Sequence, residues 1–163
     1  MVDVVDAAAR SRMMSGIQSK NTKPEISIRL ALHARGYRYR LHVKKLPGKP
    51  DLVLPKYNAV VFVHGCFWHG HSCRYFKVPK TRTDFWLEKI GKNQARDKFQ
   101  EAALLGLGWR VLVVWECAVR STNREKSPVL IDLIAEWLIN GNEYSHIDEK
   151  ECSTIVSATI LKG

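Results

Sequence analysis

The sequence lacks the features of membrane-spanning, secreted, repeat and multidomain proteins. Its 163 residues contain no apolar run that approaches the ~20 residues a membrane helix needs. The first residues include Asp3 and Asp6 and no apolar segment like that of a signal peptide. No internal repeat, low-complexity tract or long linker interrupts the chain. We therefore expect a cytoplasmic protein with one domain, long enough to bury a full hydrophobic core.

Cysteine is scarce, and the four cysteines are unevenly placed. Cys66 and Cys73 lie close to His71, and Cys117 follows an apolar segment much later in the chain. Disulfides are rare in the cytoplasm, whereas three thiolates and an imidazole form a ligand set for tetrahedral zinc. Because the spacing differs from the usual C-x₂-C, free buried thiols and a disulfide remain alternatives. We take Cys152 as a bystander in the C-terminal tail.

Acidic residues are also few. Asp and Glu number 16 against 26 Lys and Arg, a formal net charge of +10. Residues 1–50 contribute +8 (eleven basic, three acidic), residues 51–120 +5 (eleven, six) and residues 121–163 −3 (four, seven). This distribution favours binding to a polyanion such as nucleic acid, with a merely basic soluble protein as the alternative.

The spacing of apolar residues predicts an α/β protein, in which helices cover a mixed β-sheet. Thr22-Lys23-Pro24-Glu25 is typical of a capping box, and the helix it opens would end near Gly36. After it we expect strands at 37–42, 51–54 and 59–63, helices from 83 to 90 and onward through 105 with a bend at Gly91, a strand at 109–115 and a helix from 127 to near Gly141. We divide the chain into a basic arm (1–20), a single domain (21–141) and a tail (142–163).

One carboxylate stands where many nucleases bind a metal ion. Asp51 follows Pro50 at the start of an expected strand, a place where nucleases carry Pro-Asp before a Glu-x-Lys on the next strand. Here the next strand has Val61-Phe62-Val63-His64, so the Glu and the Lys are missing. Either Asp51 is only a turn residue, or histidines replace the missing groups.

Histidines and aromatics crowd the segment after that strand. His64, His69 and His71 share it, and an imidazole is suited to proton transfer near neutral pH. Phe67-Trp68 is either a local core or a wedge that unstacks DNA bases. Met13-Met14 in the arm could form such a wedge as well. Basic residues from Lys77 to Lys92 form either a solvated face or a phosphate-binding surface, in which we expect contacts from Lys89, Lys92 and Asn93.

Together these motifs resemble the very short patch repair (Vsr-type) endonucleases over roughly residues 3–140. The resemblance rests on Arg10-Ser11, Met14, Glu25, 46-LPGKPD-51, 64-HGCFWH-69, His71-x-Cys73, 76-FKVP-79, 81-TRT-83, 85-FWLEKIGKN-93, Asp97, 108-GWRV-111 and 115-WEC-117. It implies a restriction-endonuclease-like core with a structural zinc, in a bacterial-type cytoplasm or nucleoid. It also implies Mg²⁺-dependent nicking of the thymine strand, 5′ to the T of a T:G mismatch left by deamination of 5-methylcytosine. Mismatched double-stranded DNA is then the partner, mismatch-repair proteins are possible further partners, and a monomer is expected.

The resemblance also assigns roles to individual residues. Asp51 and the backbone carbonyl of Val63 match the Mg²⁺ ligands, His69 the base that activates water, and Glu25 an assisting acid. His64 and Asp97 match a supporting pair beside the site. The zinc ligands would be Cys66, His71, Cys73 and Cys117, and the DNA wedge Met14, Phe67 and Trp68.

The sequence departs from the family pattern at Met13, at Gly70 and in the divergent tail. These departures affect what can be inferred about the sequence around the mismatch and about contacts made by the tail, and they do not affect the chemistry. Two other functions are considered: a related restriction or structure-specific nuclease, and a zinc-stabilised DNA-binding module without catalysis. The joint presence of Glu25, Asp51 and His69 argues against the second of these.

Overall fold

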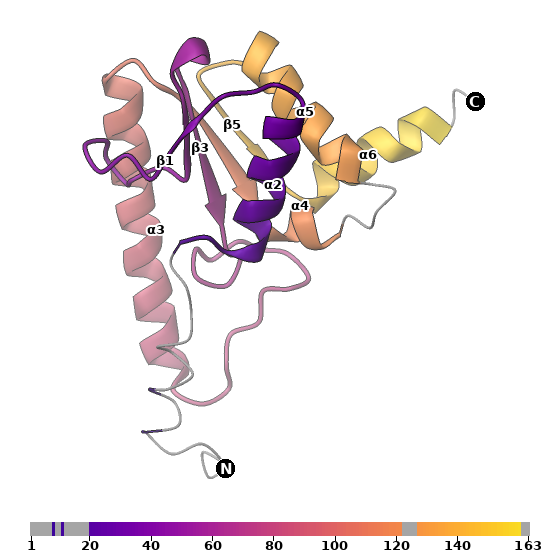
Figure 1. The fold of residues 1–163 in the computed structure, drawn as a ribbon. Coiled ribbons are helices and arrows are strands. Elements are labelled where there is room, and N and C mark those ends of the chain that lie inside the picture. The colour runs from indigo at the N-terminus through magenta and orange to yellow at the C-terminus, as the bar shows by residue number, and fades with distance from the viewer. Residues whose placement is uncertain (1–7, 9–10, 12–19, 122–126, 161–163) are drawn as a thin grey trace.

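The computed structural model describes residues 20–121 and 127–160, together with Ala8 and Ser11 (Figure 1). In these residues a five-stranded sheet lies between helices on both faces (Figure 1). The elements in chain order are α2 (Lys23–Ala34), β1 (Arg40–Leu41), β2 (Leu52–Leu54), the 3₁₀ turn η1 (Pro55–Tyr57), β3 (Ala59–His64), α3 (Thr83–Gly106), β4 (Arg110–Trp115), α4 (Glu116–Arg120), α5 (Ser127–Asn140), β5 (Tyr144–Ile147) and α6 (Glu149–Ile160). The predicted mixed α/β architecture is confirmed.

The sheet has the strand order β1-β2-β3-β4-β5. The pairs β1–β2 and β2–β3 are antiparallel, whereas β3–β4 and β4–β5 are parallel. The central strand β3 is almost wholly apolar because both of its faces are buried. Since β3 and β4 are parallel neighbours, the segments that follow them start at the same edge of the sheet.

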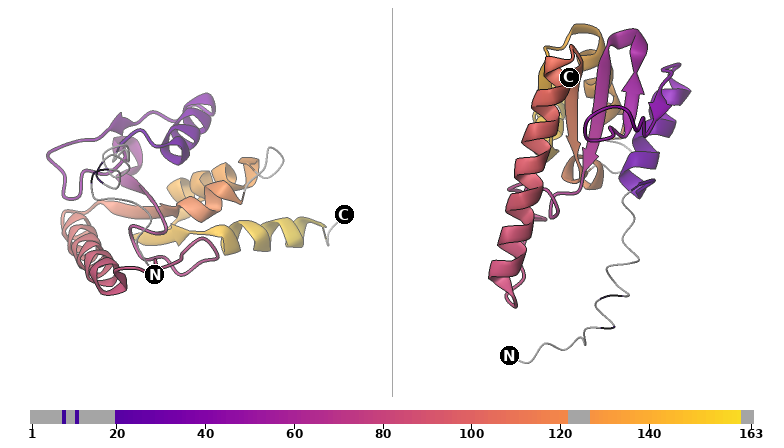
Figure 2. Two further views of the ribbon diagram at one scale, coloured as in Figure 1. Left: turned by 90° about the horizontal axis from the view of Figure 1, so that it is seen from below. Right: turned by 90° about the vertical axis from the view of Figure 1, so that its left-hand side faces the viewer.

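Alternating side chains divide the core into two layers. Val61 and Leu112 point into the larger layer, which also receives residues from α2, α4, α5 and α6. Val60, Phe62 and Val113 point into the smaller layer, which α3 covers through Leu104. Figure 2 shows α3 alone on its face of the sheet, with the other helices on the opposite face. In the described residues, no helix is long and apolar enough to cross a membrane.

Two predictions of local structure are wrong. The two helices expected on either side of Gly91 are one helix, α3, because Gly91 faces open space and a glycine in a helix costs only about 1 kcal/mol. The strand expected at 37–42 is reduced to Arg40–Leu41. Its partner β2 is only three residues long, and His42 leaves the extended conformation with φ of 47°.

The residues after 141, expected to be a tail, form a strand and a helix of the domain. They contribute β5, which pairs with β4 in parallel, and α6, which packs against α4 and α5. Cys152, expected to be a bystander, is only 4% exposed and belongs to the larger core layer. The prediction missed these elements because β5 has four residues, half of them exposed, and so lacks an apolar run.

Candidate active site

A segment without regular structure, residues 65–82, connects β3 to α3 and carries six of the candidate residues. Its first part folds tightly, since the N–H of His71 donates to the carbonyl of Cys66 at 2.9 Å. It is fastened to α3, where Asn93 donates to the carbonyl of Trp68 at 2.8 Å. Gly70 has φ of 65°, and a side chain there would collide with Gln94 of α3. Glycine at this position therefore allows the segment to lie directly on the helix.

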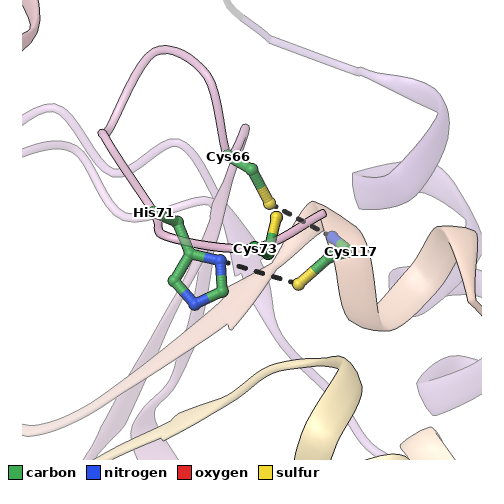
Figure 3. Close-up of side chains that lie close together, drawn as sticks. All are labelled: Cys66, His71, Cys73 and Cys117. Carbon is green, nitrogen blue, oxygen red and sulfur yellow. Dashed lines mark hydrogen bonds between the residues drawn. The ribbon is translucent and has the colours of Figure 1, made fainter. Parts of the chain in front are cut away.

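Four ligating side chains converge where β3 and β4 end. Cys66 and Cys117 are buried beyond the ends of these two parallel strands, and His71 and Cys73 reach them from the connecting segment (Figure 3). The four ligand atoms lie within 4.8 Å of one another, and His71 Nδ1 is 3.7 Å from Cys117 Sγ. Ligands on a tetrahedral zinc lie roughly 3.5–3.8 Å apart. The cluster thus has the donors of a zinc site, and the separation of His71 from Cys117 matches that of two zinc ligands.

One thiol of the cluster ionises easily. A hydrogen bond from Cys66 lowers the pKa of Cys117 to about 7, although burial opposes this shift; the same hydrogen bond, together with burial, raises the pKa of Cys66. The thiolate, which is the form of cysteine that binds metals, is therefore accessible near neutral pH.

Asp51 lies just before β2, on the edge of the sheet beside β3. Its carboxylate accepts a hydrogen bond of 2.7 Å from the N–H of Val63. Continuing the β2–β3 register places Pro50 opposite Val63, and proline has no N–H to donate to the Val63 carbonyl. In an extended strand the N–H and C=O of one residue point to the same side. The carbonyl of Val63 thus points to the side where Asp51 lies. Pro50, opposite it, cannot donate a hydrogen bond to this carbonyl.

Glu25 and His42 extend the group around Asp51. Ligand atoms of the three residues lie within 4.8 Å of one another, and His42 Nε2 is 3.0 Å from Glu25 Oε1. Only half of the predicted capping box forms: Thr22 accepts from the N–H of Glu25, but the Glu25 carboxylate turns to His42 and Arg29.

This group has the charge and burial of a cation site. Glu25 is only 2% exposed. Burial raises the pKa of Asp51 to about 7; the hydrogen bond from Val63 opposes that rise and the charge of Glu25 adds to it. Carboxylate oxygens are the ligands that hard divalent cations such as Mg²⁺ prefer, and a cation would offset the repulsion between the two carboxylates. The donors present therefore fit Mg²⁺.

His69 is oriented by two neighbours. Its Nδ1 forms a hydrogen bond of 2.5 Å with Asp97 of α3, and its ring stacks on His64 with centroids 3.8 Å apart. Burial opposes ionisation of Asp97, but the hydrogen bond and the charge of His69 hold its pKa below the ordinary value. Burial, with His69 nearby, lowers the pKa of His64 to about 3, so His64 is neutral at neutral pH. Asp97 is thus hydrogen-bonded to His69, while His64 supports the ring by stacking.

Both groups open into one cavity of about 440 Å³. Its walls include Lys20, His42, Lys49, Asp51, Val63, His64, His69, Arg96, Asp97 and Gln100. The basic side chains on this list suit an anionic substrate. His42 was missed from the sequence because a single histidine in an alternating strand pattern is usually solvated, and only the fold brings it to Glu25.

Aromatic side chains cluster where the connecting segment meets the start of α3. Phe67 and Trp68 contact each other edge to face, and Trp86 of α3 packs against both. Lys89 lies over the Trp68 ring. Trp86 was not singled out in the sequence, because its place three residues into a helix gave no sign that it meets Phe67.

Two other residues expected to contact DNA, Lys92 and Asn93, form contacts within the protein. Lys92 pairs with Glu88 on the exposed face of α3, and the Asn93 side chain holds Trp68 in place. Met13 and Met14 lie outside the described residues.

Comparison with known proteins identifies the family of this chain. A family model described as DNA mismatch endonuclease Vsr matches residues 2–75. The DNA mismatch endonuclease Vsr of Escherichia coli (strain K12) is 45% identical over 148 residues, covering 91% of this chain and 95% of that protein. The type II nicking enzyme V.XorIIP of Xanthomonas oryzae pv. oryzae is 54% identical over 117 residues, 72% of this chain and 86% of that protein. V.NmeAIP, a type II nicking enzyme of Neisseria meningitidis, is 51% identical over 121 residues, which cover 74% of this chain and 86% of that protein. The chain therefore belongs to the Vsr family of DNA mismatch endonucleases and is a DNA endonuclease.

Proposed function

We propose that this endonuclease nicks the thymine strand of a T:G-mismatched duplex, immediately 5′ to the mismatched T, and so initiates very short patch repair. The observation that carries the proposal is the convergence of Asp51 and the His69–Asp97 pair on one cavity with basic residues in its wall. A restriction-endonuclease-like core agrees with the mixed sheet and with the position of Asp51 beside β3. One copy of the chain carries all these residues, so a monomer suffices.

Asp51 and the carbonyl of Val63 are the proposed Mg²⁺ ligands, with Glu25 and His42 beside them. The chemistry that Mg²⁺ supplies at such a site is polarisation of the scissile phosphate and activation of water. The Val63 N–H fixes the Asp51 carboxylate by its 2.7 Å hydrogen bond. Lys49 and Arg96 in the cavity wall favour approach of the phosphodiester anion.

His69 is the proposed base. Asp97, as a carboxylate, accepts the Nδ1–H of His69, which leaves Nε2 with a lone pair to take a proton from water. His64, neutral and stacked on the ring, holds this orientation without adding charge. The arrangement resembles other catalytic histidines whose tautomer is fixed by a carboxylate.

The aromatic cluster of Phe67, Trp68 and Trp86 is the proposed DNA wedge in the described part of the chain. Large apolar side chains that enter between base steps unstack them, at a cost that is lower at a mismatch. We propose a structural role for zinc, since the cluster of cysteines and His71 joins the segment bearing His69 to the end of β4. Mismatch-repair proteins would act after the nick.

Replacement of His69 by alanine is expected to lower the nicking rate about 10²–10³-fold, the usual effect of losing a general base. Asp97→Asn should lower the rate by at least as much, because the asparagine amide can donate to Nδ1 and so favour the tautomer whose Nε2 has no lone pair. The rates are measured with enzyme in excess over a labelled T:G duplex. His33→Ala is the control, since His33 is exposed on α2. Equal rates for wild type and His69→Ala would contradict the role of His69.

The proposed substrate is tested with two duplexes that differ only in one base pair, T:G or T:A. We expect the T:G duplex to be nicked at least about 100-fold faster, because opening the stack is cheaper at a mismatch. Each reaction is run with Mg²⁺ and with excess chelator. Equal cutting of both duplexes would favour a related restriction or structure-specific nuclease.

A further inference from the structure

The N-terminus of α6 reaches the cysteine–histidine cluster through Asp148. The Oδ2 atom of Asp148 lies 3.3 Å from His71 Nε2, while the other ring nitrogen, Nδ1, faces Cys117. Asp148 is only 8% exposed, and Trp115 stacks on the His71 ring with centroids 4.3 Å apart. One edge and one face of the imidazole are therefore held by residues outside the cluster.

Asp148 is itself fixed by α6. Its Oδ1 accepts from the N–H of Lys150 at 2.7 Å and from that of Glu151 at 3.4 Å. The Glu151 carboxylate returns to the N–H of Asp148 at 2.8 Å, which completes a capping box. One carboxylate thus caps the helix with one oxygen and meets His71 with the other.

A second interaction joins the same helical turn to the cluster. The backbone N–H of Glu149, in this turn, lowers the pKa of the Cys117 thiol. The first turn of α6 therefore influences two of the four ligands, His71 through Asp148 and Cys117 through a backbone N–H. A centre with three thiolates carries a net negative charge, which helix N–H groups stabilise.

From these contacts we infer that Asp148 is a positioning residue for His71 and makes the first turn of α6 part of the metal centre. The carboxylate accepts the Nε2–H of His71, which fixes the tautomer that presents the Nδ1 lone pair to the metal. Metal binding and docking of α6 are then coupled, and the coupling is reciprocal. This inference rests on the proposed zinc centre.

Two substitutions separate this role from simple helix capping. Asparagine caps helices as well as aspartate does, so Asp148→Asn keeps the cap but loses the anionic acceptor for His71. Asp148→Ala loses both. Glu136→Gln is the matched control, because Glu136 is exposed on α5 and its carboxylate accepts a hydrogen bond from Asn140, outside the cluster. If Asp148 only caps the helix, Asp148→Asn will bind zinc like the wild type.

The test measures zinc affinity of the full chain by competition with a colorimetric chelator. We expect Asp148→Asn and Asp148→Ala each to weaken zinc binding about 10–100-fold, and Glu136→Gln to change it less than about 2-fold. Cobalt-loaded Asp148→Asn should show shifted ligand-field bands, which a purely structural change would not produce. Wild-type affinity in Asp148→Asn overturns the inference and leaves the zinc centre standing.

Hydrogen exchange of the wild type tests the coupling without a variant. Removal of zinc should speed exchange in residues 150–155 at least about 10-fold, with little change in β3, because loss of the metal releases the first turn of α6. Unchanged exchange in α6 would contradict the coupling. A wild-type chain that binds no zinc at all would overturn the zinc centre and this inference together.

Discussion

Replacement of Asp51 by asparagine is expected to lower the nicking rate at least about 10⁴-fold, or about 5.5 kcal/mol in activation free energy. The amide oxygen still accepts the hydrogen bond from Val63, but the proposed anionic ligand for Mg²⁺ is lost. Affinity for the T:G duplex should be retained or slightly increased, because the substitution removes a negative charge from a cavity that binds a phosphate. Single-turnover nicking and a gel-shift titration measure the two effects separately.

Asp132→Asn provides the matched control. Asp132 pairs with Arg35 on the surface of α5, far in the sequence from the cavity residues, and its loss should leave nicking unchanged. If Asp51→Asn nicks at the wild-type rate, Asp51 is not a metal ligand. If it loses both nicking and DNA binding, its role is structural.

Replacement of Cys117 by serine should reduce bound zinc from one per chain to nearly none. Zinc present at a thousand times its dissociation constant contributes about 4 kcal/mol to folding, so we expect a fall of roughly 10 °C in Tm. Nicking should fall as well, because the segment held by the cluster carries His69. Elemental analysis and thermal unfolding at fixed zinc concentration measure these changes.

Cys152→Ser is the control for this experiment. Cys152 is also a buried cysteine, but it lies in the larger core layer and is not part of the four-ligand cluster. We expect it to keep its zinc and to lose about 1–2 kcal/mol from burial of a hydroxyl group. A Cys117→Ser variant with wild-type zinc content would exclude Cys117 as a ligand.

Features with local causes could be predicted from the sequence. Thr22 and Pro24 mark the start of α2, and the apolar run of 59–63 indicates a strand buried on both faces. The grouping of Cys66, His71 and Cys73 is local as well. Cys117 could be added because an apolar strand precedes it.

Features that arise from tertiary contacts could not be predicted in this way. His42 meets Glu25 only because the fold brings the residue after β1 to the first turn of α2, and Asp148 meets His71 only because β5 lies beside β4 in the sheet. Gly91 was given too much weight, since packing of α3 on the sheet outweighs a modest helix propensity. The segment after 141 has little hydrophobic pattern, yet it supplies a strand and a helix to the fold.

The most direct test of the proposed function is a map of the nick. A T:G duplex carries a different label on each strand, and the products formed with Mg²⁺ are sized against a sequence ladder. We predict one product, from the thymine strand, that ends immediately 5′ to the mismatched T. Cuts in both strands, or a cut whose position does not move when the mismatch is moved, would contradict the proposed function.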